Sequence, residues 1–156
     1  YKNFTLSFFF QGTYGNDIVN ANTIANNTSS SMTGIQNITR EQYNTRWTAE
    51  NAANARWPKP IEAGYKREWK FSDRYIEDGS YLRLKNISLG YTFFPKWKGI
   101  KSINVYASAQ NLFTITGYSW YDPDVNAYGN DVTRQGVDLY SYPSSRVYSF
   151  GLKLTF

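Results

Sequence analysis

The chain has 156 residues and a net charge of +5, with 14 Tyr, 10 Phe and 5 Trp but no Cys and no His. This composition excludes disulfide scaffolds, zinc sites with Cys or His ligands, cysteine nucleophiles and catalytic triads that use His as the base. The 17 basic residues form no tract that indicates nucleic-acid binding, and no apolar run approaches the roughly 20 residues of a membrane helix. Strands that cross a membrane in a β-barrel stay possible, because only every second residue of such a strand must be apolar.

Four segments alternate between apolar and polar residues, which is typical of strands with one apolar face. In chain order, we expect these strands at about residues 3–14, 80–94, 101–115 and 146–156. Each segment is close to the roughly 9 to 11 residues that a tilted strand needs to cross a bilayer. The chain opens directly in a strand pattern at Tyr1, and we therefore expect it to be part of a longer protein.

The connections between the expected strands differ greatly in length. The second and third strands are joined by a short turn at residues 95–100, whereas the other two connections span about residues 15–79 and 116–145. Within the first long loop, Thr39 and the residues after it fit a capping box, which predicts a short helix from Arg40 to Trp47. Short turns on one side of a sheet and long loops on the other are typical of outer-membrane barrels.

The last ten residues combine a polar residue, a glycine, an apolar residue and a terminal aromatic at fixed positions: Ser149, Gly151, Leu154 and Phe156. This pattern resembles the C-terminal signal by which the barrel-assembly machinery recognises outer-membrane proteins. Such recognition would proceed by pairing with an exposed strand edge, with alternate side chains giving specificity. A strand that simply ends the chain is the alternative.

Several polar and aromatic loop residues are candidates for a substrate site or an interface with a lid protein: Trp47, Trp57, Trp120, Tyr121 and Asp122. Aromatic rings of this kind can stack on sugars or peptide side chains, but they can equally pack the loops together or anchor the membrane rim. No two carboxylates are fixed at a catalytic separation, so we expect no enzymatic activity and no cofactor.

A calcium site is a weaker candidate, with oxygen ligands from Asp122, Asp124 and Asn126. An EF-hand loop would need Gly and Glu where this sequence has Ala127 and Thr133. A turn rich in Asp and Asn is therefore the favoured interpretation.

Several stretches of the chain form an ordered set, at residues 46–51, 73–91, 110–114, 117–118, 121–124, 136–138 and 142–143. In their order and spacing they resemble the C-terminal end of the SusC/RagA family of TonB-dependent outer-membrane transporters. The stretch from Asp73 to Tyr91 is the most specific of them.

The resemblance implies an all-β fold in which this chain forms the last four antiparallel strands of a 22-stranded transmembrane barrel. The plug domain and the remaining strands would lie outside the chain, the 95–100 turn and the C-terminus would be periplasmic, and the long loops would be extracellular. The implied partners are a SusD-like surface lipoprotein, the TonB complex acting through the missing N-terminal region, the barrel-assembly machinery, outer-membrane lipid, and an oligosaccharide or peptide substrate. Nucleic acid is not among them.

The alternation of the second expected strand leaves open which face its first polar residues take. Simple alternation places Tyr81, Arg83 and Lys85 on the same face as the apolar Ile87 and Leu89, where their polar groups would lie near lipid phosphates. A local bulge that reverses the facing is the competing interpretation.

A soluble β-sandwich that binds glycans is the rival to a transporter. A sandwich would bury its apolar faces against each other and normally needs about seven strands, whereas the pattern predicts four.

Overall fold

The structure is a computed structural model that describes residues 1–26, 30–31, 34–35, 37–59, 72–125, 127–129, 131 and 135–156. The chain divides into two compact units, which are considered separately. The first comprises residues 1–16, 78–124 and 142–156, and the second comprises the described residues within 17–77 and 125–141. Within the described part of the chain, no helix has the length and apolar character needed to cross a membrane.

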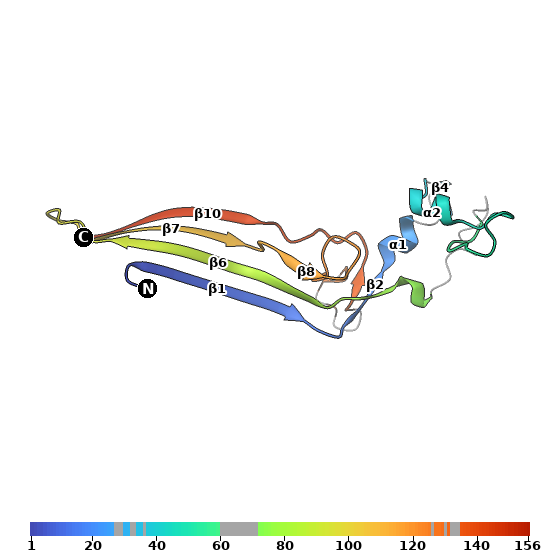
Figure 1. The fold of residues 1–156 in the computed structure, drawn as a ribbon, viewed down its shortest axis with the longest axis horizontal. Coiled ribbons are helices and arrows are strands. Elements are labelled where there is room, and N and C mark those ends of the chain that lie inside the picture. Colours follow the sequence, from blue (N-terminus) through green and yellow to red (C-terminus); the bar gives the residue numbers. More distant parts are fainter. Residues whose placement is uncertain are drawn as a thin grey trace. The chain divides into compact units, whose positions relative to one another are not determined.

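The first unit is built on an antiparallel sheet with the strand order β1-β6-β7-β10 (Figure 1). Its strands are β1 (Phe4–Thr13), β6 (Tyr81–Phe93), β7 (Ser102–Gln110) and β10 (Val147–Thr155), and a short strand, β8 (Thr114–Thr116), also pairs with β6. The four main strands pair in the order in which they occur along the chain, even though long loops separate some of them. The prediction of antiparallel pairing is therefore confirmed for this sheet.

The third strand is broken where the alternation predicts a continuous strand over residues 101–115. Strand β7 ends at Gln110, because Asn111 adopts a left-handed conformation with φ of 50°, which asparagine tolerates better than most residues. The N–H of Asn111 donates to the carbonyl of Lys85, which keeps this irregular segment attached to β6 before β8 begins. The expected strand over residues 101–115 is thus replaced by two shorter strands, β7 and β8.

A β-bulge in β6 decides which way its first residues face. Phe9 of β1 lies opposite Asn86, but the next residue, Phe10, lies opposite Leu84, so Lys85 has no counterpart in β1. The extra residue reverses the alternation, and Arg83 lies opposite Gln11 on the polar face. The placement of Arg83 on the apolar face is therefore wrong, and the bulge interpretation is confirmed.

Apolar side chains fill one face of the sheet row by row. One row consists of Leu6, Leu89, Ala107 and Phe150, whereas the adjacent row on the opposite face consists of Ser7, Ser88, Ser108 and Ser149. The apolar face is open in this chain, and the ring of Phe150 is 83% exposed. Contiguous apolar surface of this kind is rare on monomeric soluble proteins and is typical of sites that contact another protein, a ligand or a membrane.

The sheet also has two open edges. Among the described residues, β1 pairs only with β6, and β10 pairs only with β7. Open edges and an uncovered apolar face leave a four-stranded sheet poorly protected on its own.

The second unit contains a small sheet with the order β5-β2-β9, in which β2 and β9 run parallel. Its elements are β2 (Asp17–Asn20), α1 (Ala21–Asn26), β3 (Ser30–Ser31), β4 (Gly34–Ile35), α2 (Arg40–Thr45), a 3₁₀ turn η1 (Asp73–Tyr75), β5 (Ile76–Asp78) and β9 (Val137–Asp138).

Polar residues make up much of the buried interior of the second unit. The side chains of Asn20, Asn22 and Asp138 are fully buried. The Asn20 amide donates to the Glu77 carboxylate at 2.7 Å, and the Asn22 side-chain oxygen accepts from the backbone N–H of Tyr140. Buried polar groups of this kind are tolerated when they are hydrogen-bonded, and here they hold distant parts of the two loops in one arrangement.

The predicted helix in the first long loop is confirmed in the second unit. Thr39 caps it, since its hydroxyl accepts from the N–H of Gln42 at 3.2 Å. The helix ends at Thr45 rather than at Trp47, because Arg46 is extended and forms a β-bridge with Trp57.

Candidate functional site

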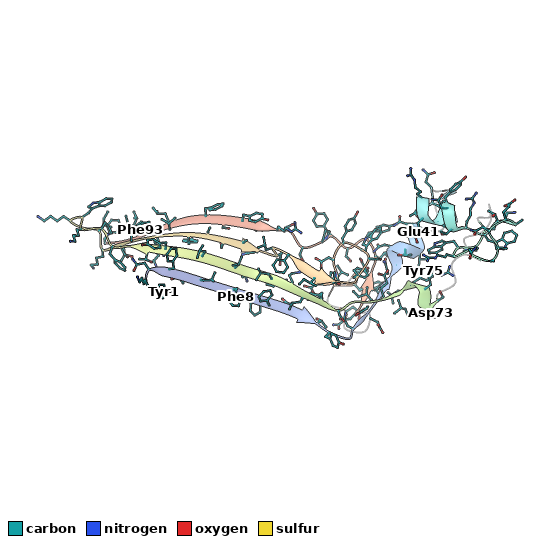
Figure 2. All side chains as sticks on the ribbon, in the orientation of Figure 1. Tyr1, Phe8, Glu41, Asp73, Tyr75 and Phe93 are labelled. Atoms are coloured by element: carbon teal, nitrogen blue, oxygen red, sulfur yellow. The ribbon has the colours of Figure 1, made fainter. Side chains whose placement is uncertain are left out.

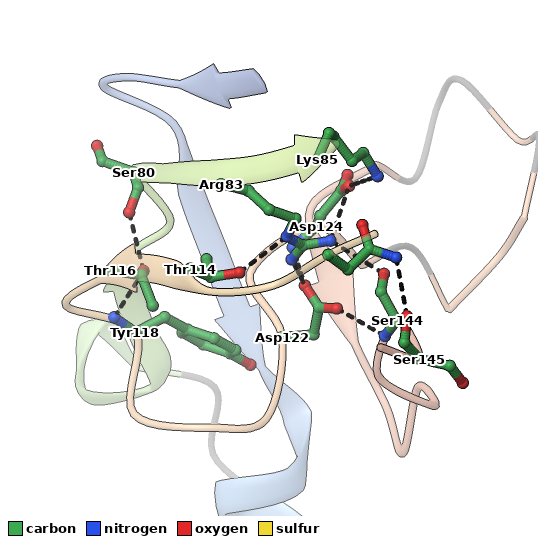
Figure 3. Close-up of polar contacts among 11 residues, drawn as sticks. Ser80, Arg83, Lys85, Thr114, Thr116, Tyr118, Asp122, Asp124, Ser144 and Ser145 are labelled. Atoms are coloured by element: carbon green, nitrogen blue, oxygen red, sulfur yellow. Dashed lines mark hydrogen bonds and ion pairs between the residues drawn. The ribbon is translucent and has the colours of Figure 1, made fainter. Parts of the chain in front are cut away.

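A buried arginine organises a polar cluster on the polar face of β6 (Figure 3). The Arg83 side chain is only 2% exposed. Its Nε donates to the Thr114 hydroxyl at 2.8 Å and its Nη1 donates to the Ser144 hydroxyl at 3.0 Å, while its Nη2 donates to the carboxylate of Asp122. Thus one side chain from β6 binds β8 and two separate loop segments.

A second carboxylate balances the charge of this cluster. Asp124 lies 3.5 Å from Nη1 of Arg83 and 3.6 Å from Nζ of Lys85, the bulge residue. Asp122 also accepts two backbone hydrogen bonds, from the N–H of Asp124 at 2.9 Å and from the N–H of Ser144 at 2.8 Å. The charges of the two cations and the two anions compensate each other. We call these four residues, together with Thr114 and Ser144, the Arg83 anchor.

The surroundings of Asp122 favour its ionised form. Burial by itself raises the pKa of the Asp122 carboxyl, but the backbone N–H groups of Ser144 and Asp124 and the Arg83 guanidinium outweigh it and lower that pKa below its ordinary value. A carboxylate that accepts several hydrogen bonds in this way is charged at neutral pH. The Arg83 anchor is therefore an ion pair under ordinary conditions.

Further hydrogen bonds tie the same loops to the ends of the strands. The Asn111 side-chain amide donates to the carbonyl of Ser145 at 2.9 Å, and the Thr116 hydroxyl donates to the carbonyl of Ser80 at 2.9 Å. Tyr118 is buried, and its N–H donates to the Thr116 hydroxyl at 3.1 Å. The segments around residues 116–124 and 143–146 are thus fixed over the polar face of the sheet.

A polar cavity of about 340 Å³ lies beside the Arg83 anchor. Its lining includes Asn111, Tyr121, Pro143 and Arg146 in addition to members of the anchor. The volume is at the lower end of the range of ligand pockets, roughly 300 to 1,000 Å³. Such a cavity can receive a small part of a ligand, such as one ring or one side chain.

The structure separates the predicted binding residues into the two units. Trp120, Tyr121 and Asp122 belong to the first unit, where the rings of Trp120 and Tyr121 meet edge to face at 5.1 Å. Tyr121 lines the polar cavity and is 73% exposed, whereas Asp122 is buried in the anchor.

Trp47 and Trp57 belong to the second unit and are joined by a backbone hydrogen bond of 2.7 Å. The guanidinium of Arg74 lies 4.9 Å from the centre of the Trp57 ring, a distance at which cation and ring attract each other. The Trp57 ring is therefore in contact within its own unit, whereas the Trp47 side chain is exposed.

The candidate calcium ligands have cationic neighbours. Asp122 and Asp124 face Arg83 and Lys85, and Asn126 lies outside the described residues. In the parts of the chain that the structure describes, no group of three or more acidic side chains could hold a metal ion.

The predicted assembly signal lies on the edge strand β10 and just after it. Phe150, Leu152 and Leu154 share the apolar face, and Phe156 follows the end of the strand, 72% exposed. Gly151 lies opposite Tyr106, and a Cβ atom added to this glycine would be only 2.3 Å from Cζ of that tyrosine. The ring of Tyr106 thus occupies the space that a side chain at position 151 would need.

Sequence reasoning missed the central role of Arg83 and the contributions of Thr114 and Ser144. The period-2 pattern did carry a signal for the bulge, because the apolar residues change parity from Leu82 and Leu84 to Ile87 and Leu89. The polar residues also gave a clue, because placing the charged Arg83 on a face otherwise made of Ile and Leu is energetically costly.

Comparisons with known proteins place this geometry in context. No protein-family model matches the chain. The chain is 36% identical over its whole length to TonB-dependent receptor P3 of Formosa agariphila and 30% identical to TonB-dependent receptor SusC of Bacteroides thetaiotaomicron. It spans only 15% and 14% of the lengths of these two relatives.

Solved structures give the same result for the fold. The chain superposes on the RagAB peptide importer in its closed-closed state with a TM-score of 0.76 and 24% identity, covering 100% of this chain and 16% of that one. For the open-open state the TM-score is 0.75 at 25% identity, covering 99% of this chain and 16% of that one.

Proposed function

The chain matches the C-terminal part of the SusC/RagA family of TonB-dependent receptors along its whole length, and from this we propose that it forms the closing wall strands of an outer-membrane nutrient importer. The observation that carries this proposal is the contrast between the two faces of the sheet. One face carries exposed apolar side chains, whereas the other carries polar side chains and, around Arg83, loop segments that are fixed through the Arg83 anchor. A barrel wall needs such a division, because lipid lies on one side and the lumen on the other.

In the proposed arrangement β1, β6, β7 and β10 are the last four strands of a 22-stranded barrel. The turn at 95–100 and the C-terminus face the periplasm, and loops 15–79 and 116–145 face the exterior. The common location of this turn, the start of β1 and the end of β10 at one end of the sheet supports this orientation (Figure 1). The plug domain and the other strands belong to parts of the protein outside this chain.

The imported substrate is proposed to be an oligosaccharide or a peptide, captured with a SusD-like surface lipoprotein. SusC is among the relatives, and the RagAB structures are described as those of a peptide importer. Trp47, Trp57, Trp120 and Tyr121 are proposed to contribute to the substrate cavity or to the lid interface, and Asp122 to hold the loop that carries two of them.

Energy for import would come from TonB acting on the N-terminal region, and β10 would guide insertion by the barrel-assembly machinery. The chain itself performs no catalysis in this account. Its contribution is a wall against lipid, a set of fixed outer loops and a closing edge strand.

The experiment uses the full-length protein in its native host. We expect the protein in the outer-membrane fraction, copurifying with a surface lipoprotein in mild detergent, and we expect its deletion to abolish growth on one class of oligosaccharide or peptide. A soluble protein that binds glycans without membrane association would contradict the proposal and favour a β-sandwich module.

A further inference from the structure

Charge is distributed very unevenly along the chain. All 12 acidic side chains lie within residues 17–78 and 122–138. The remaining segments form most of the sheet and its short turn, and all their charged side chains are basic. Arg83 and Lys85 are compensated by Asp122 and Asp124, but the basic residues near the short turn have no acidic residue near them in the sequence, and a cluster of one sign attracts anions.

Five lysines gather at the end of the sheet where the short turn lies: Lys2, Lys96, Lys98, Lys101 and Lys153. Backbone hydrogen bonds fix this end, since the N–H of Thr92 donates to Asn3 at 2.9 Å and the N–H of Lys101 donates to Thr155 at 2.7 Å. All five lysine side chains are exposed, and none of them takes part in an ion pair among the described residues.

Exposed aromatic rings lie among these lysines. Trp97, between Lys96 and Lys98, is 65% exposed, and Phe94 is 67% exposed. Tyr1 and Phe93 lie at the same end of the sheet (Figure 2). Aromatic side chains collect at the boundary between hydrocarbon and headgroups, where an apolar ring and a wet surface can both be satisfied.

We propose that this end of the sheet, formed by Lys96, Lys98 and Lys101 with Trp97 and Phe94, binds the anionic headgroups of phospholipids at the periplasmic membrane surface. The inference rests on the proposed function, because the apolar face must lie against lipid. Lys101 precedes Ile103 by two residues and so continues the apolar face toward the headgroups. Ammonium groups just beyond an apolar band meet lipid phosphates at the depth where those phosphates lie.

Lipid fits this surface better than a soluble phosphate compound does. The lysines are spread over an open turn rather than lining a cavity, and the aromatic rings between them offer an apolar surface that a small anion would not use. Lys153 provides an internal comparison, because it lies opposite Asn104 on the polar face and points away from the lipid side. The proposal therefore distinguishes the three lysines in and next to the turn, which should bind lipid, from Lys153, which should not.

The test is native mass spectrometry of the full-length protein, purified in detergent and mixed with phosphatidylglycerol and phosphatidylcholine of identical acyl chains. We expect preferential retention of phosphatidylglycerol, and a drop of about tenfold to a hundredfold in that preference for the variant with Lys96→Gln, Lys98→Gln and Lys101→Gln. The size follows from roughly fivefold per lysine near an anionic surface. The preference should also decrease at high salt.

Two control variants sharpen the result. Lys153→Gln and the triple loop variant Arg40→Gln, Arg56→Gln and Lys59→Gln should keep the preference for phosphatidylglycerol. Equal retention of the two lipids by the wild type, an unchanged preference in the turn variant, or full competition by soluble glycerol phosphate would overturn the inference. A wild type that is in the outer membrane but shows no lipid preference refutes this inference alone, whereas absence from the membrane refutes the proposed function as well.

Discussion

At the scale of single residues, the facing of Arg83 depends on Lys85, the bulge residue two positions later in β6. The bulge at Lys85 moves Arg83 from the apolar face to the polar face, where Asp122, Thr114 and Ser144 surround it. A buried guanidinium is costly unless its hydrogen-bonding groups are satisfied, and each of its three nitrogens donates to a partner here. Charge compensation at Arg83 thus helps to fix the loops, beside the neutral hydrogen bonds of Asn111 and Thr116.

Arg83→Met in the full-length protein should loosen the loops at 116–124 and 143–146. The change leaves Asp122 buried without its counter-ion, which costs about 3–5 kcal/mol. Limited proteolysis in detergent should show faster cleavage in these loops. Lys85→Ala, which removes a partly exposed partner at 3.6 Å, should cost less than about 1 kcal/mol.

The double variant Arg83→Met with Asp122→Asn serves as the control for this experiment. It removes the buried charge but keeps one side-chain oxygen, whereas the N–H groups of Asp124 and Ser144 donate to different oxygens of Asp122. One of these two hydrogen bonds is therefore lost, and only part of the loss in stability should be recovered. Equal damage from Arg83→Met and Lys85→Ala would show that the anchor is not centred on Arg83.

The Arg83 anchor should weaken in acid. The pKa of Asp122 is lower in the folded chain than its unfolded value of about 3.9, so its stabilising contribution is present above that pH and is lost as the pH falls through the folded pKa. Hydrogen exchange of the loop amides should therefore be constant from neutral pH to about pH 5, after correction for intrinsic rates, and protection should fall at lower pH. Protection that rises on acidification, or an identical acid profile in Asp122→Asn, would contradict this assignment.

At the scale of elements, the edge strand β10 is matched to its neighbour by a glycine and an aromatic ring. Tyr106 lies between Gly90 of β6 and Gly151 of β10, and its ring covers Gly151. Packing against Tyr106 therefore explains the glycine at position 151 without any recognition by the assembly machinery. The two explanations make different predictions for a double substitution.

Gly151→Ala should lower the stability of the β7–β10 pair by about 1–3 kcal/mol, because the new methyl group displaces the Tyr106 ring. Adding Tyr106→Ser should restore much of the stability and the yield of folded protein in the membrane, both measured by heat-modified mobility in gels. A defect in Gly151→Ala that Tyr106→Ser leaves unchanged would mean that the glycine itself is recognised during assembly.

At the scale of the whole molecule, alternation and turn residues were sufficient to predict the main strands of the larger sheet and the short turn at 95–100, whereas the antiparallel pairing followed from the resemblance to the SusC/RagA family. A period of two reports which face a residue takes only while the pairing stays regular, so it failed at Lys85 and at Asn111, where backbone geometry changes. The capping box at Thr39 predicted α2 because a cap is a local interaction. The Arg83 anchor joins residues up to 61 positions apart, and no local pattern contains that information.

The central claim is that one face of this sheet meets lipid and the other meets water, and alternate positions in β6 test it most directly. Ser88 and Leu89 are neighbours in the chain with opposite facing, and this chain contains no cysteine of its own. Single substitutions Ser88→Cys and Leu89→Cys in an otherwise cysteine-free full-length protein would be labelled in outer-membrane vesicles with a water-soluble or a lipid-soluble maleimide. We predict that Leu89→Cys reacts with the lipid-soluble reagent alone, whereas Ser88→Cys reacts with the water-soluble one. Equal reaction of both positions with the water-soluble reagent would contradict the account.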